Sequence, residues 1–152
     1  MNEHLIGEVV SINPAKCRAR IKFDDRDGII SEELAVVVKG SLKNKDYWMP
    51  RVGEAVLCSF AGKKGFILGA IYSDADPPPV SSEKKRYIEF EDGTAIEYDS
   101  ATHTLTVECV GTINIKGNIT VSEGDIVVDG ISIKNHIHSA PGGNTSPPIG
   151  GG

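Results

Sequence analysis

The sequence predicts an all-β protein built from two different kinds of β structure. Residues 1–73 contain short runs in which apolar and polar residues alternate, with turn residues between the runs. Three consecutive prolines follow at positions 77–79, and beyond them a longer alternation is interrupted mainly by single glycines. Alternation with a period of two is typical of strands that bury one face, and few helix signals accompany it.

The first region predicts a small closed barrel. Strands are expected at residues 5–12, 17–23, 34–38, 55–60 and 66–72, separated by turn or loop segments at 13–16, 24–28, 41–49, 50–54 and 61–65. The run from Cys17 to Phe23 shows the pattern most clearly, because charged and apolar side chains alternate along it. Five short strands is the number found in the OB-fold, so we expect residues 1–73 to form an OB-fold domain.

Residues 74–87 are expected to be a proline-rich linker. Proline has no backbone N–H to give to a strand ladder, and a proline run favours a stiff, extended chain. Directly after the linker, residues 87–98 predict a solvated β-hairpin that turns at Gly93 and Thr94 and carries several acidic side chains.

Residues 88–134 hold the most regular pattern in the chain. From Leu105 to Val121 the odd positions are mostly apolar and the even positions mostly polar. Glycines recur along this region at short intervals, at Gly111, Gly117, Gly124 and Gly130. One such stretch cannot bury its own apolar stripe, and its backbone groups need partners. It could fold back as a meander or wind around identical copies.

Three features favour winding around identical copies, one of which is that the segment ends in two histidines, His136 and His138, that lack partners. Single glycines suggest gentle bends rather than two-residue hairpin loops, and residues 99–152 contain no Phe, Tyr or Trp to build a thick core. We therefore expect residues 88–134 to form a homotrimeric intertwined β-helix, or β-prism, with three Ile/Val stripes facing one axis.

His136 and His138 are the candidate metal ligands. In an extended chain, residues two apart point to the same side, and imidazole is the commonest protein metal ligand. Two ligands are too few for a metal site, so the others must come from elsewhere or from other copies. Simple alternation from Ile133 would point both histidines away from the axis. A turn or bulge at Lys134 and Asn135 is therefore required if they are to face it.

Composition limits the function classes. The formal net charge is −5, which argues against a nucleic-acid binder, and no apolar run reaches the length of a membrane span or forms a signal peptide. The three cysteines are widely spaced, which predicts reduced, buried thiols. No catalytic motif is recognised, so we expect no enzymatic activity.

Two alternative functions stay open. The loop at 41–49 contains Lys43, Lys45, Tyr47 and Trp48, which an OB-fold binder of single-stranded nucleic acid could use for phosphate contacts and base stacking. A metal hydrolase would need the two histidines plus a carboxylate and an open coordination position.

The whole plan resembles the central spike of contractile phage tails, the baseplate assembly protein V family. The resemblance rests on the barrel, the linker, the glycine-spaced β region and the end of the chain. Its most specific part is the run from Lys134 through His136-Ile137-His138-Ser139, followed by Gly142-Gly143-Asn144-Thr145. The spike of type VI secretion VgrG proteins is similar in plan.

The resemblance implies a homotrimer at the tip of the tail baseplate in the virion, assembled in the host cytoplasm. It implies partners in the baseplate hub and tail tube, and an apex that meets and pierces the host outer membrane. It also implies one structural iron ion per trimer, held by His136 and His138 of three chains. Six nitrogens favour an octahedral ion over tetrahedral zinc. Residues 135–152 would form this apex, with the Gly/Pro tail capping it.

Overall fold

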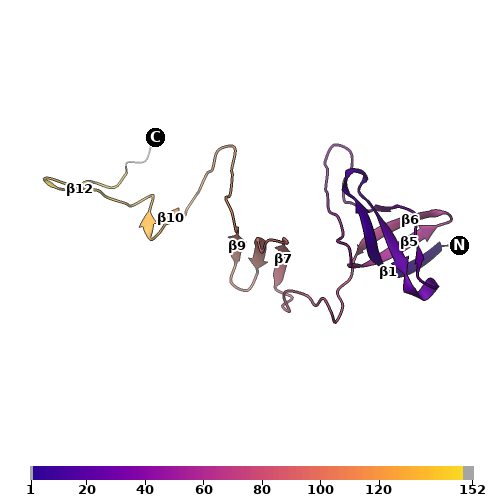
Figure 1. Ribbon diagram of the computed structural model, residues 1–152. Helices are drawn as coiled ribbons and strands as arrows, with labels where there is room; N and C mark the ends of the chain where they lie inside the picture. The colour runs from indigo at the N-terminus through magenta and orange to yellow at the C-terminus, as the bar shows by residue number, and fades with distance from the viewer. Residues whose placement is uncertain (1, 149–152) are drawn as a thin grey trace. The chain divides into compact units, whose positions relative to one another are not determined.

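The computed structural model describes residues 2–148 and divides the chain into two compact units, one ending at Arg86 and one beginning at Tyr87 (Figure 1). The regular structure is all β apart from two single-turn 3-10 helices, η1 (Pro14–Lys16) and η2 (Asp24–Arg26). The predicted all-β class is confirmed. Within the described residues, no helix is long and apolar enough to cross a membrane.

The first unit is a closed barrel. Its main strands are β1 (Asn2–Asn13), β2 (Arg18–Phe23), β4 (Leu34–Val36), β5 (Ala55–Ala61) and β6 (Lys64–Ala70). They pair in the order β1-β5-β6-β4-β2, and β2 pairs back with β1. Only β4 and β6 pair in parallel among these strands. A five-stranded closed barrel was predicted, and the short strand β3 (Ile29–Ile30), which pairs with β2, was not.

Strand β1 closes the barrel because it pairs on both edges. Its first part pairs with β5 from Asn2 to Glu8, and its second part pairs with β2 from Glu8 to Asn13. The register shifts between Val9 and Ser11, a bulge of the kind that bends a strand and increases its twist. The crossing is tight at Gly7, where an added Cβ would lie 2.6 Å from the Ile21 side chain and 2.6 Å from the Lys22 carbonyl oxygen.

The hydrophobic core of the described residues lies in this barrel. Inward-facing positions of β2 alternate with exposed ones, as the sequence pattern predicts. The ring of Phe60 packs edge-on against that of Phe23, with centroids 5.8 Å apart. The buried core residues are Val9, Ala19, Ile21, Phe23, Leu34, Val36, Val56, Cys58 and Ile67.

The second unit begins with an antiparallel sheet. Its strands are β7 (Lys85–Glu89), β8 (Ala95–Asp99) and β9 (Thr104–Glu108), in that order. The predicted hairpin at 87–98 is present, although β7 begins within the expected linker and a third strand extends the sheet. The prolines at 77–79 lie outside any strand, between β6 and β7.

Two small hairpins follow. Strand β10 (Val127–Val128) pairs with β11 (Ile131–Ser132), and β12 (Ser139–Ala140) pairs with β13 (Gly143–Asn144). The first hairpin turns through Asp129 and Gly130, both with positive φ (48° and 82°), which is the backbone of a two-residue hairpin turn. The expectation that single glycines make only gentle bends is therefore wrong at Gly130, because Asp129 and Gly130 together form a tight hairpin turn.

Residues 109–126 contain no strand, although their sequence alternates like one. A strand is defined by hydrogen bonds to a neighbour, and here the single chain places no neighbouring strand beside them. The alternation at Leu105 and Val107 does lie in a strand, β9, because β8 pairs with it.

Candidate metal centre

The segment between β11 and the paired histidines is a turn. Residues 133–135 have turn geometry, and the His136 N–H donates to the Ser132 carbonyl at 3.0 Å. The Asn135 N–H donates to the Ser132 hydroxyl at 2.8 Å. The strand alternation that ends at Ile133 is therefore not carried through to His136. The sequence requires a turn at Lys134 and Asn135 if the histidines are to point to the side of the apolar stripe, and a turn is present there.

The two imidazoles lie against each other. The ring centroids of His136 and His138 are 5.1 Å apart, and the ring planes are nearly perpendicular, at 88°. His136 is half-buried and His138 is exposed. The sequence argument from spacing expected the two rings to share one side of the chain, and in the structure they do.

A backbone contact fixes the ring of His136. Its Nδ1 lies 2.9 Å from the Ile133 carbonyl oxygen. Because a carbonyl oxygen only accepts, Nδ1 carries the hydrogen, which leaves the lone pair on Nε2. Metal-bound histidines commonly donate the second ring N–H to a carbonyl in this way. The donor chemistry of His136 therefore fits a metal ligand.

The chain beyond His138 folds back and holds that residue. The His138 N–H donates to the Thr145 hydroxyl at 2.8 Å, and the Thr145 N–H donates to the His138 carbonyl at 2.8 Å. The hairpin of β12 and β13, which turns at Pro141 and Gly142, makes this return possible. Sequence reasoning assigned the tail a capping role but did not identify Thr145.

Asp125 supports the turn from the other side. Its Oδ1 accepts the N–H of Ile126 at 2.8 Å and the N–H of Lys134 at 3.0 Å. The Ser132 hydroxyl, these backbone N–H groups and the charge of Lys134 all hold the pKa of Asp125 below its usual value, the hydroxyl having the largest effect. No local sequence pattern indicates this role, because the contacts join residues on opposite sides of a hairpin.

One chain brings two candidate ligands together at this site. Within residues 2–148, no group of three or more His, Cys, Asp or Glu side chains is placed to hold a metal ion. The other two histidines are exposed and belong to other elements, His4 to β1 and His103 to the turn between β8 and β9. The carboxylate that a metal hydrolase would need is therefore not brought to His136 and His138 within the described chain.

Part of the loop proposed for nucleic-acid stacking packs against the barrel. Trp48 packs against the core, and its indole N–H donates to the Val37 carbonyl at 3.0 Å. Tyr47 stays 61% exposed and its hydroxyl lies 3.4 Å from the Pro14 carbonyl oxygen. Lys43 and Lys45 are exposed. The indole is thus used in packing rather than presented as a stacking platform.

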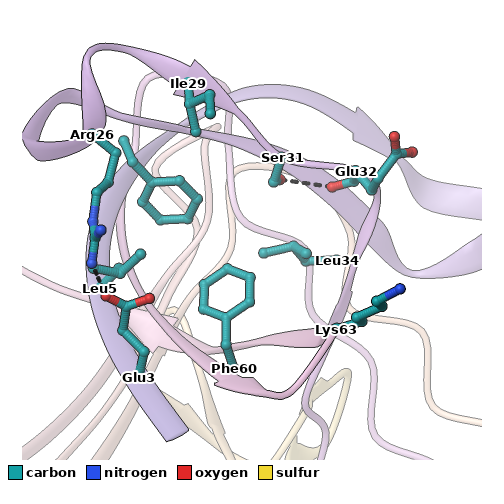
Figure 2. A pocket seen from close by; sticks show the side chains of 10 residues that line it. Glu3, Leu5, Arg26, Ile29, Ser31, Glu32, Leu34, Phe60 and Lys63 are labelled. Carbon is teal, nitrogen blue, oxygen red and sulfur yellow. Dashed lines mark hydrogen bonds and ion pairs between the residues drawn. The ribbon is translucent and has the colours of Figure 1, made fainter. Parts of the chain in front are cut away.

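The barrel also has an apolar recess at one mouth, with a volume of about 360 Å³. Figure 2 shows Leu5, Leu34 and Phe60 pointing into it, with the Glu3–Arg26 ion pair at its edge. The paired charges neutralise each other at the rim. The recess presents mainly hydrocarbon and contains no histidine or cysteine.

The second unit leaves most of its apolar residues open to solvent. In the three-stranded sheet, Ile96 lies opposite Val107 and Tyr98 opposite Leu105. These four side chains are 37% to 66% exposed and make up most of one apolar face.

On the other face of this sheet, Tyr87 lines a small pocket with Ala95 and three polar residues of β8 and β9. Partial burial, and next the carboxylate of Glu89, raise the pKa of Tyr87.

The same exposure continues to the end of the described chain. All thirteen Val, Leu and Ile residues from Leu105 to Ile137 are at least 41% exposed. An exposed apolar surface of this extent is typical of an interaction site. The prediction of buried thiols is confirmed for Cys58 in the barrel and wrong for Cys109, which is exposed, while Cys17 is only partly buried.

Fold and site together define an all-β chain with a self-contained barrel, an open apolar second unit and a paired-histidine turn. No protein-family model matches the chain. It is similar to the spike protein of Escherichia phage P2, with 30% identity over 122 residues, which cover 77% of this chain and 56% of that protein. The chain thus spans about half the length of this curated relative. The similarity confirms the resemblance to phage tail spikes.

Proposed function

We propose that this chain is the trimeric, cell-puncturing spike of a contractile tail baseplate. In this role it is a structural protein without enzymatic activity. Three second units would wind together into an intertwined β-helix, and the paired histidines would lie at its apex. The similarity to a phage spike protein supports the tail context.

The observation that carries the proposal is the exposure of every large aliphatic side chain from Leu105 to Ile137. Complete burial of one such side chain contributes roughly 1.5–3 kcal/mol, and a whole domain is stable by only about 5–15 kcal/mol. Thirteen side chains left about half-exposed therefore forgo roughly 10–20 kcal/mol, which is comparable to the whole stability of a domain. Identical copies around one axis would bury the stripe and pair the backbone of 109–126 at the same time.

Three copies also complete the metal centre. His136 and His138 from three chains supply six imidazole nitrogens, a set that suits octahedral iron and not tetrahedral zinc. An ion with six protein ligands has no open position, so its role is to tie three chain ends that would otherwise fray. The tautomer fixed at His136 supports this assignment because it frees Nε2.

The two units would serve different ends of the assembly. The barrels would form the base, in contact with hub and tail-tube proteins, and the histidine apex would meet the host outer membrane. The chain would then be assembled in the host cytoplasm and act in the virion. Single-stranded nucleic-acid binding is disfavoured by the net charge of −5 and by the packing of Trp48.

The test is the mass in solution together with metal analysis. We expect a particle of three 16.2-kDa chains that holds about one iron ion. A variant with His136→Ala and His138→Ala should lose the iron, whereas one with His4→Ala and His103→Ala, which removes the two isolated histidines, should keep it. A monomer, or a trimer whose iron survives the first double substitution, would contradict the proposal.

A further inference from the structure

A short chain of hydrogen bonds connects Asp125 to the paired histidines. Asp125 accepts the Lys134 N–H, and the Ile133 N–H donates to the Ile126 carbonyl at 2.9 Å. Ser132 accepts the Asn135 N–H on its hydroxyl and the His136 N–H on its carbonyl. The Ile133 carbonyl then receives the Nδ1–H of His136. Every residue from 133 to 136 is tied by its backbone N–H in this network.

We propose that Asp125 and Ser132 are positioning residues for the histidine metal centre. The inference rests on the proposed function, because it concerns how the same two imidazoles are presented to a shared ion. Neither side chain is a metal ligand. Their role is to set the turn that changes the direction of the chain between Ile133 and His136.

The surrounding structure explains why side chains are needed for this task. The neighbouring hairpin has only two residues in each strand, β10 and β11, so its ladder provides few hydrogen bonds. The turn itself is exposed, apart from His136, and water competes for its amides. Two of the four turn amides, those of Lys134 and Asn135, are bound by the side chains of Asp125 and Ser132. Without these acceptors, only the backbone hydrogen bonds of the Ile133 and His136 N–H groups hold the turn.

The effect acts through the ring of His136. The Ile133 carbonyl can orient the imidazole only while residues 132–136 keep the observed turn. Loss of such outer contacts typically lowers metal affinity by about 10- to 100-fold without removing a ligand. A residue that served only general stability would instead change the unfolding of the trimer and leave the ion's environment unaltered.

The experiment uses the full-length trimer and two pairs of variants. Asp125→Ala removes the acceptor, whereas Asp125→Asn keeps a side-chain oxygen that can bind the same backbone N–H groups. Ser132→Ala removes the hydroxyl, whereas Ser132→Thr retains one. Asp129→Asn is the control, because it removes a carboxylate from the turn of the same hairpin and asparagine tolerates its positive φ. Iron affinity is measured by competition with a chelator, and the absorption spectrum of bound iron reports its ligand geometry.

We expect Asp125→Ala and Ser132→Ala to release iron at about 10- to 100-fold lower chelator concentration and to shift its absorption spectrum. Asp125→Asn, Ser132→Thr and Asp129→Asn should lie close to the unsubstituted protein. If Asp125→Ala fails to assemble, the comparison of Ser132→Ala with Ser132→Thr tests the inference. Unchanged affinity and spectrum in the alanine variants, with iron still lost from the His136→Ala, His138→Ala double variant, would overturn this inference and leave the proposed function standing. An unsubstituted trimer without iron would overturn the inference together with the iron part of the proposed function.

Discussion

The barrel and the second unit carry the same kind of alternating sequence with opposite results. Nine of the ten buried hydrophobic residues of the described chain lie in the barrel, and Ala95 is the remaining one. In the second unit, Ile113 and Ile115 stay 58% and 63% exposed. The difference shows that alternation prescribes a face to be buried but does not say which chain buries it.

Strand pairing explains the contrast in physical terms. In the barrel, β1 bends at its bulge and pairs with both β2 and β5, so the sheet closes within one chain. In the second unit, the hairpins β10–β11 and β12–β13 have strands of two residues each, and 109–126 has no paired strand. Isolated elements of this size are marginal in water. The described second unit therefore does not bury its apolar stripe within one chain, whereas the barrel does.

The largest expected effect comes from Ile115→Asp. In the proposed trimer, three carboxylates would meet on an apolar axis, and each buried charge costs several kcal/mol. We expect loss of the trimer, measured by analytical ultracentrifugation, while the fluorescence of Trp48 in the barrel stays unchanged.

The matched control for this test is Asn114→Asp, which adds the same charge at the neighbouring, polar position. A substitution on an exposed surface changes stability by about 0.5 kcal/mol or less, so this variant should remain a trimer. If Ile115→Asp behaves like Asn114→Asp, the stripe is not a trimer interface. The proposal that the second unit buries its apolar face between chains would then be wrong.

A smaller effect, confined to the barrel, is expected from Gly7→Ala. The new Cβ would meet the backbone oxygen of Lys22 at 2.6 Å, and backbone cannot move aside cheaply. Overpacking of this kind costs about 1–3 kcal/mol, so the barrel should unfold at lower denaturant concentration while the trimer persists. Gly69→Ala is the control, since its Cβ would meet nothing within 4 Å. Equal midpoints for the two variants would show that β1 does not cross as tightly as described.

Much of the barrel could be predicted from sequence. The expected strands at 17–23 and 55–60 agree with β2 and β5 to within a residue, because each alternates regularly and is bounded by turn residues. The two-residue strand β3 was missed, since Ile29 and Ile30 pair without any alternation. The bulge in β1 was missed as well, because it depends on two neighbours that the local sequence does not encode.

At the candidate site, the closeness of the two histidine rings was predictable from sequence, but the residues that hold the turn beside them were not. The spacing of His136 and His138 indicates a shared side, and the phase of Ile133 indicates that a turn must follow. The acceptors that form that turn, Asp125 and Ser132, are brought together only by the Asp129-Gly130 hairpin. These contacts join residues across a hairpin, so no local sequence pattern predicts them. The iron and the trimer remain predictions.

The smallest expected effect is a difference in thiol alkylation between the two units. Cys58 is fully buried in the barrel, and desolvation raises the pKa of its thiol to about 11. The thiolate is the reactive form, so Cys58 should resist alkylation at pH 8 whatever the oligomeric state. Cys109 is exposed in the single chain and lies on the odd-numbered stripe. It should therefore be protected in the native trimer and react rapidly in the Ile115→Asp variant, as read by mass spectrometry of the alkylated chain. Equal labelling of Cys109 in both proteins would mean that the stripe stays open to solvent in the assembled protein. Alternation would then predict a buried face in the barrel but not in the second unit.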